Sequence, residues 1–553
     1  MTIVQRRIGG IFALFFGLLL IAGGRTLYLG ALKGGSLRKA AATQQLTYEV
    51  VPAQRGSITD RNGVDLAVSE PAQDVSADPY LLTEPLATAQ KLAPLLGKPQ
   101  AQVLRELSQR SGFVYLARAL PAKQAREVMA LKVPGVSGTP VMRRVYPRAT
   151  LAAQVLGAVG TEGDGLSGLE YSSNSLLHGH TGERRVVSDA RGQPVSISEP
   201  HPEQAGTPLS LTIDANIQQR AEEVLGAVGR VFSPKDATAI VMDPRTGAIL
   251  AMANWPQVNP NDPSASSPEA MENRAVGFDY EPGSTFKAVT VAGALQQGLV
   301  TPTSSFFVPN QIRVADRTIH DDTEHADETL TTAQILAQSS NVGAIKIGAL
   351  EGPSNFSNWV SRFGFGRRTG IELPGEEIGQ VLPVSKYSGS SMGNLPIGQG
   401  QLVTPLQMAS AYSAIANGGI LQPPHIIQSV GSRSQAVPAG RRVISAQTAG
   451  SLRQMLEGVL APGGTASEVS IPGYQLAGKT GTASKVDPAT GEYSKTAYVA
   501  SFMGFAPASN PKLLCAVIVD EPQAGSIFGG TVAAPAFGEI MSFALPYLRI
   551  PPG

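Results

Sequence analysis

The first apolar stretch of the chain is an uncharged run between Arg7 and Arg25, IGGIFALFFGLLLIAGG. Its length approaches the roughly 17 to 25 residues with which a helix crosses a bilayer, whereas a cleaved signal peptide usually has an apolar core of about 7 to 15. The pattern therefore predicts a membrane anchor over 8–30 and a cytoplasmic tail over 1–7, because Arg6 and Arg7 favour the cytoplasmic side. No second run of this length follows, so the remaining chain is expected outside the cytoplasm.

The spacing of apolar residues changes after the anchor. Residues 81–135 carry Leu and Ala three and four positions apart, as in LATAQKLAPLLG, which predicts mainly helix. The stretch that follows is rich in glycine and predicts an irregular, extended module up to about residue 205. We therefore expect residues 31–205 to form a first extracytoplasmic domain.

From Thr207 onward the pattern is that of a folded α+β domain. PLSLTIDANIQQRAEEVLGAV predicts a strand followed by a helix, and ATAIVMDPRTGAILAMA predicts two strands about a turn. Near the other end, YVASFMGFAPASNPKLLCAVIVD predicts two further strands and APAFGEIMSFALPYL a closing helix. Strands from both ends around a helical middle predict one α+β domain over 206–553, whose sheet is completed by distant parts of the chain.

Composition excludes some functions without assigning one. The formal net charge is +1 and no long run has a single sign, so no nucleic-acid partner is expected. The single cysteine, Cys515, excludes an intramolecular disulfide and lies in an apolar run typical of a buried strand. The segment IHDDTEH, residues 319–325, matches no zinc spacing, so we expect a polar loop there and no metal site.

Candidate chemistry begins with Ser284 and Lys287 in YEPGSTFKAV. A serine hydroxyl is a weak nucleophile unless a neighbouring group takes its proton. On a helix these two residues would share a face, and Pro282 and Gly283 would place the serine at the N-terminal end, where unpaired N–H groups favour an oxyanion. The spacing alone is a weak signal, because SLRK at Ser36 repeats it.

The order of three motifs makes the signal specific. Ser339 and Asn341 belong to a Ser-Ser-Asn triplet, which also occurs at 172–174, and the single Lys-Thr-Gly triplet begins at Lys479. Ser-x-x-Lys, Ser-x-Asn and Lys-Thr-Gly, in this order within one domain, are the motifs of penicillin-interacting serine transpeptidases and β-lactamases. A Ser-His-Asp hydrolase is the disfavoured alternative, and the chain has only six histidines for the role of its base.

The first two motifs and the lysine of the third predict the proton transfers. We hypothesise that Ser284 attacks a carbonyl carbon and that Lys287, kept neutral by burial and by the charge of Lys479, takes its proton. Ser339 would relay that proton to the leaving amine, and Asn341 would orient Lys287 and the substrate amide.

The third motif predicts the substrate-binding strand. Thr480 and Thr482 would grip a substrate carboxylate, and Gly481 would let the ligand backbone lie against the strand. The backbone N–H groups of Ser284 and Thr482 would form the oxyanion hole.

The chain resembles the class B penicillin-binding proteins, bitopic D,D-transpeptidases that cross-link peptidoglycan. In the first domain, RGSITDRNGVDLA, RRVYP, VLGAVG and GLSGLE are similar to the family's pedestal motifs. LTIDANIQ, EPGSTFK, QSSNVG, LPIGQG, AGKTGTA and AAPAF then follow in the family's order, so the resemblance covers nearly the whole chain.

This resemblance implies a pedestal for dimerisation or partner binding over 31–205 and a transpeptidase domain over 206–553, with a five-stranded antiparallel sheet flanked by helices and no cofactor. The implied substrate is a stem peptide ending in D-Ala-D-Ala. Ser284 displaces the terminal D-Ala, and an amine of a neighbouring strand then takes the acyl group. β-Lactams would acylate the same serine. The implied partners are a SEDS-type glycosyltransferase, which polymerises the glycan, and other wall-synthesis proteins.

Within the family, the pedestal and the ending LPYLRIPPG are more similar to the cell-division (septal) member than to the elongation member. Two other interpretations remain open. A β-lactam sensor or β-lactamase would keep the three motifs without needing the pedestal. A morphogenetic scaffold with little turnover would not require intact motifs, whereas all three motifs of this chain are intact.

Overall fold

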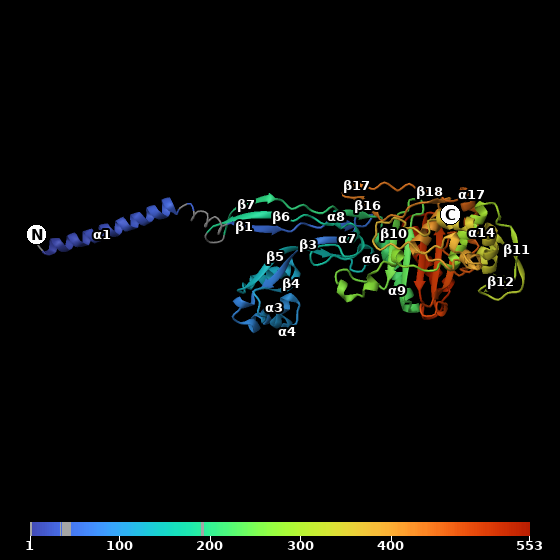
Figure 1. The fold of residues 1–553 in the computed structure, drawn as a ribbon, viewed down its shortest axis with the longest axis horizontal. Coiled ribbons are helices and arrows are strands. Elements are labelled where there is room, and N and C mark those ends of the chain that lie inside the picture. The colour runs from blue at the N-terminus through green and yellow to red at the C-terminus, as the bar shows by residue number, and fades with distance from the viewer. Residues whose placement is uncertain (1–2, 34, 36–45, 190–192, 553) are drawn as a thin grey trace. The chain divides into compact units, whose positions relative to one another are not determined.

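The computed structural model describes residues 3–33, 35, 46–189 and 193–552 (Figure 1). The chain divides into two compact units: the first comprises the N-terminal part to Gln54, Pro71–Met142 and Gly179–Ala205, and the second everything else to the C-terminus. Segments 55–70 and 143–178 pack within the second unit, together with the region after 206. The domain limits drawn from the sequence remain a prediction.

The N-terminal helix α1 (Ile3–Leu27) contains most of the predicted anchor. It continues through the π-helical turn η1 (Tyr28–Leu32), and none of its side chains is buried in the protein. It is long and apolar enough to cross a membrane, and no other helix of the described residues passes that test. An apolar helix without protein contacts is suited to lipid contact.

The first unit contains a helical subdomain and a three-stranded sheet. The helices α3 (Pro85–Leu96), α4 (Gln100–Leu107) and α5 (Ala122–Ala130) confirm most of the predicted helical region. The prediction missed strand β4 (Val114–Pro121), in which Leu116 and Leu120 are buried. It was also wrong about part of the irregular stretch, since β6 (Gly182–Ser188) and β7 (Pro194–His201) within it form an antiparallel sheet with β1 (Leu46–Val51).

The second unit is built on the predicted five-stranded antiparallel sheet, in the order β10-β9-β21-β20-β19. Figure 1 shows the green strands from the start of the region beside the orange and red strands from its end. The strands are β9 (Asp236–Met242), β10 (Ile249–Trp255), β19 (Ala477–Val486), β20 (Tyr493–Ala506) and β21 (Leu513–Asp520). The prediction that distant segments complete one sheet is therefore confirmed.

Alternate residues of this sheet enter two different cores, as the period of two in a strand requires. On β21, Leu513, Cys515 and Val517 pack with α9 (Ala215–Phe232) and α18 (Gly529–Tyr547), so the cysteine is buried as predicted. Leu514 and Ala516 belong to the opposite core. The helices of that core are α12 (Lys287–Gln296), α13 (Thr332–Gln338), α14 (Asn341–Arg362), α16 (Pro405–Ala416) and α17 (Ala446–Glu457).

The RGSITDRNG, RRVYP and GLSGLE motifs meet at one buried carboxylate of the second unit. Glu170, on α7 (Gly168–Ser172), is fully buried and accepts hydrogen bonds from Arg55 Nε at 2.5 Å and Arg144 Nε at 2.7 Å. The hydroxyl of Tyr146 lies 3.4 Å from the same carboxylate. Removing one partner of a buried ion pair is costly, because the remaining charge stays without compensation.

We therefore predict that Glu170→Ala lowers the free energy of unfolding by about 3 to 5 kcal/mol, since it leaves two guanidinium groups unpaired. Denaturant unfolding of the full chain in detergent measures the change. Glu223→Ala, at an exposed position of α9, is the control and should change stability by less than about 0.5 kcal/mol. Equal stability of the two variants would show that the buried cluster contributes little.

Candidate active site

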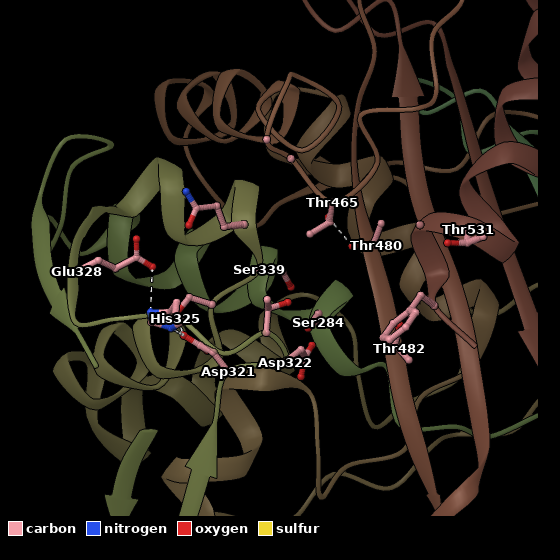
Figure 2. Close-up of a pocket in the computed structure, with 17 residues that line it drawn as sticks. Ser284, Asp321, Asp322, His325, Glu328, Ser339, Thr465, Thr480, Thr482 and Thr531 are labelled. Carbon is pink, nitrogen blue, oxygen red and sulfur yellow. Dashed lines mark hydrogen bonds and ion pairs between the residues drawn. The ribbon is translucent and has the colours of Figure 1, made fainter. Parts of the chain in front are cut away.

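The three sequence motifs open onto one cleft of about 630 Å³ in the second unit. Figure 2 shows Ser284 between the loop that carries Asp321 and Asp322 and the strand β19 that carries Thr480 and Thr482. The remaining walls come from the α13–α14 junction, the loop at 463–465 and the start of α18. The residues that line the cleft are Ser284, Asp321, Asp322, Thr323, His325, Glu328, Gln338, Ser339, Ser340, Gly463, Gly464, Thr465, Thr480, Thr482, Phe528, Gly530 and Thr531.

Ser284 lies in a tight 3-10 turn, η4 (Gly283–Phe286), that leads into α12, so the predicted position at a helix start is correct. The turn is held by Gly398 of the LPIGQG motif, where a Cβ atom would lie 2.2 Å from the carbonyl oxygen of Gly283. The hydroxyl of Tyr412 also donates to the carbonyl of Thr285 at 2.7 Å. Within the described residues, the Ser284 hydroxyl makes no hydrogen bond, and the serine lines the cleft.

Lys287, three residues after the serine at the start of α12, is fully buried. Its Nζ donates to the Ser339 carbonyl at 2.5 Å, to Asn341 Oδ1 at 2.6 Å and to Ser339 Oγ at 3.3 Å. Burial lowers the pKa of Lys287 to about 8, against the opposing charges of Asp322 and Asp321. The amine is therefore a far better base near neutral pH than an ordinary lysine, although most molecules still carry its proton at pH 7.

Ser339 and Asn341 are presented by the break between α13 and α14. Ser339 ends α13 in the left-handed conformation, with φ at 64°, and this directs its carbonyl and hydroxyl toward Lys287. Asn341 begins α14, and its Nδ2 donates to the His320 carbonyl at 2.9 Å and to Asp322 Oδ1 at 3.1 Å. Because the NH₂ end is held there, the amide oxygen faces Lys287.

The other Ser-Ser-Asn triplet, at 172–174, has a structural role. Asn174 Oδ1 accepts a hydrogen bond from Arg55 at 2.7 Å and another from the Gly165 N–H at 3.1 Å. It lies outside the residues that line the cleft. The order of the motifs along the chain therefore selected the copy whose two serines line the cleft.

Lys479 is the second fully buried amine of the site. Burial, followed by the charge of Lys287, lowers its pKa well below the usual range, with Asp322 acting in the opposite direction. The sequence argument expected the charge of Lys479 to help keep Lys287 neutral, and because repulsion between two amines lowers the pKa of each, that expectation stays a prediction. When two buried amines interact, the pair holds on to one proton more easily than to two.

The two threonines of the third motif face the cleft, each with a partner. Thr480 Oγ1 lies 2.7 Å from Thr465 Oγ1, and Thr482 Oγ1 accepts from the Gly529 N–H at 3.1 Å. Lys479 Nζ is 3.3 Å from Thr480 Oγ1. A carboxylate placed here would meet the hydroxyl groups of Thr480 and Thr482, with the buried amine of Lys479 behind Thr480, as the predicted binding role requires.

Gly481 has a steric reason within the fold. A Cβ atom at this position would lie 2.9 Å from Thr285 Cγ2, 3.1 Å from the Pro282 carbonyl oxygen and 2.4 Å from Ser501 Oγ. The missing side chain therefore lets β19 approach the turn that carries Ser284. The predicted space for a ligand backbone along this strand stays a prediction.

Residues 321–325 form a polar loop, as predicted, whereas Ile319 and His320 end a strand that begins at Arg317. The loop also forms one wall of the cleft, which the sequence did not reveal. Asp321 accepts from the N–H groups of Asn341 and Val342 and from the Ser340 hydroxyl, so it caps α14. His325 pairs with Asp321, and its hydrogen bond to the Ala326 carbonyl is the first cause that raises the pKa of the ring. Among the residues with described positions, no three His, Cys, Asp or Glu side chains are grouped to hold a metal.

Comparison with known proteins identifies both parts of the chain. Residues 237–542 match the family described as penicillin binding protein transpeptidase domain, and residues 50–211 the penicillin-binding protein dimerisation domain. The chain is 35% identical to penicillin-binding protein PbpB of Mycobacterium tuberculosis, over 98% of this chain and 84% of the relative. It is also 35% identical to peptidoglycan D,D-transpeptidase FtsI of Escherichia coli, over 98% of this chain and 92% of that relative.

Solved structures agree with these relatives. Penicillin binding protein 3 from Mycobacterium tuberculosis, crystallised with aztreonam, superposes with a TM-score of 0.71 at 31% identity. The superposition covers 91% of this chain and 98% of that one. The same protein has also been solved with ampicillin, with a TM-score of 0.72.

We predict that Gly481→Ala slows the reaction of Ser284 with a fluorescent penicillin roughly 10- to 100-fold, because the new methyl group displaces the Ser284 turn. Gel fluorescence against time measures the rate. Gly226→Ala is the matched control, since its Cβ atom in α9 would meet only the end of the Arg230 side chain, at 3.6 Å. Wild-type reactivity in the Gly481 variant would show that the turn does not depend on this close approach.

Proposed function

This chain is a class B penicillin-binding protein, and we propose that it is a serine D,D-transpeptidase that cross-links peptidoglycan stem peptides during septal wall synthesis. The observation that supports this best is the contact of buried Lys287 with both Ser339 and Asn341, at 2.5 and 2.6 Å, under a cleft lined by Ser284, Thr480 and Thr482. Three motifs far apart in sequence thus supply a nucleophile, a base and a carboxylate site in one place.

In the first half-reaction the donor is a stem peptide ending in D-Ala-D-Ala. Neutral Lys287 takes the proton of the Ser284 hydroxyl while the oxygen attacks the carbonyl carbon of the penultimate D-Ala. The backbone N–H groups of Ser284 and Thr482 stabilise the oxyanion, and Thr480, Thr482 and Lys479 bind the terminal carboxylate. The carbon–nitrogen bond breaks, and the proton reaches the leaving D-Ala nitrogen through Ser339.

In the second half-reaction an amine of a neighbouring stem peptide attacks the ester. Lys287 takes a proton from the attacking nitrogen, the new amide forms, and the ester bond to Ser284 breaks with return of the proton to its hydroxyl. A β-lactam, as a mimic of D-Ala-D-Ala, enters the first half-reaction and stays attached to Ser284. Aztreonam and ampicillin are bound in solved structures of a relative.

The enzyme works on the outer side of the cell membrane. Helix α1 is the anchor, and Arg6 and Arg7 keep the N-terminus in the cytoplasm. A SEDS-type polymerase supplies the glycan strands and contacts the anchor and the pedestal. The similarity to the relatives named PbpB and FtsI supports the septal role.

We predict that purified full-length protein gains the mass of one β-lactam on the peptide that contains Ser284, and that Ser284→Ala gains none. Mass spectrometry of the intact and digested protein measures the adduct. Ser36→Ala, in another Ser-x-x-Lys sequence, is the control and should react like wild type. An adduct in the Ser284 variant would disprove the assignment of the nucleophile.

Cell growth separates the enzyme from the scaffold interpretation. An allele with Ser284→Ala should fail to support septation although the protein is present at normal level and position. If it restores division, the chain acts mainly by recruiting other proteins.

The rate of acylation should depend on pH through Lys287. Because only the neutral amine accepts the serine proton and burial places its pKa at about 8, the rate should rise about tenfold per pH unit below that value and level off above it. Stopped-flow measurement with a chromogenic β-lactam gives the profile. A rate that is constant from pH 6 to 9, about the range over which this amine titrates, would exclude Lys287 as the base.

A further inference from the structure

Asp322 lines the cleft from the side of the loop, and its carboxylate accepts a hydrogen bond from the side chain of Asn341. It follows strand β13 (Arg317–His320), is exposed, and lines the same cleft as Ser284 and Ser339 (Figure 2). Its neighbour Asp321 has a different position, since its side chain caps α14. None of the three catalytic motifs contains Asp322, and its role is separate from the residues assigned above.

The contact of Asp322 fixes which end of the Asn341 amide faces the base. Asn341 Nδ2 donates to Asp322 Oδ1 at 3.1 Å and to the His320 carbonyl at 2.9 Å, while Oδ1 accepts from Lys287 Nζ at 2.6 Å. If the amide turned over, its NH₂ group would face the Lys287 amine, and two donors would oppose each other. An acceptor at Asp322 therefore favours the productive orientation.

The charge of Asp322 also acts on both buried amines. The charged groups that face Lys287 are Lys479 of β19 and the carboxylates of Asp321 and Asp322, and its other partners are neutral. Asp322 raises the pKa of Lys287 and of Lys479, against the effect of burial. A negative charge at the cleft wall thus helps the lysine pair to keep one proton, and the leaving D-Ala nitrogen needs a proton.

We infer that Asp322 is a positioning residue of the transpeptidation reaction: it orients the Asn341 amide toward Lys287 and, by its charge, retains a proton on the lysine pair. This inference rests on the proposed function of Ser284 and Lys287. It assigns a task to a residue that the sequence placed only in a polar loop.

The experiment separates the charge from the hydrogen bond. Asp322→Asn keeps an oxygen acceptor and removes the charge, whereas Asp322→Ala removes both. With the full chain in detergent, D322N should move the rising limb of the acylation profile to lower pH and react about two- to fivefold faster than wild type near pH 6.5. The difference should shrink at about 1 M salt, because exposed charges are then screened within about 3 Å.

D322A should show the same shift with a lower plateau at high pH than D322N, because its Asn341 amide has lost one anchor. Glu324→Gln makes the same change of charge on an exposed residue of the same loop and is the control, with a profile like that of wild type. Profiles of D322N and wild type that superimpose would overturn the inference, and so would an equal shift in E324Q.

A second measurement does not depend on acylation. In protein labelled with ¹³C at the lysine ε carbons, NMR follows the titration of Lys287 directly, and its midpoint should be lower in D322N than in wild type. An unchanged midpoint overturns the inference even if Ser284 reacts normally. A lowered midpoint in a protein that forms no β-lactam adduct would support the role of Asp322 and refute the proposed function, so the two failures are distinguishable.

Discussion

The site depends on the burial of two amines, Lys287 and Lys479, next to each other under one cleft. An ammonium ion is costly to remove from water, and two in contact with the same low-dielectric region repel each other. The pair therefore releases a proton far more readily than surface lysines do. A lysine base available near neutral pH follows from this constraint, and so does the need for a nearby carboxylate such as Asp322 to hold the remaining proton.

The fold meets this constraint by bringing three rigid elements together. Helix α12 carries Lys287, the edge strand β19 carries Lys479, and the α13–α14 junction supplies the carbonyl and amide oxygens that solvate the buried amine. Close approach is possible only where side chains are absent, as at Gly398 and Gly481. These glycines set the position of the nucleophile, although neither is a chemical participant.

Much of this arrangement could be predicted from the sequence, because the periodicity of strands and helices is local and the three motifs have fixed spacing. One sheet completed by distant segments and the burial of Cys515 followed from such patterns, and the five antiparallel strands followed from the family resemblance. Contacts between segments that are far apart leave no local pattern, so the cap of α14 by Asp321, the pairing of Thr465 with Thr480 and the anchor from Asp322 to Asn341 were missed.

The most direct test of this account is the titration of Lys287 and Lys479 in the wild-type protein, read from ¹³C-labelled lysine ε carbons. The account predicts that Lys287 titrates near pH 8, that Lys479 titrates well below the ordinary range of a lysine, and that replacing Lys287 by methionine raises the midpoint of Lys479. It would be contradicted if either lysine titrated in the ordinary range near 10.5, or if the two titrated independently. In that case burial would not create the base, and another group would have to take the proton of Ser284.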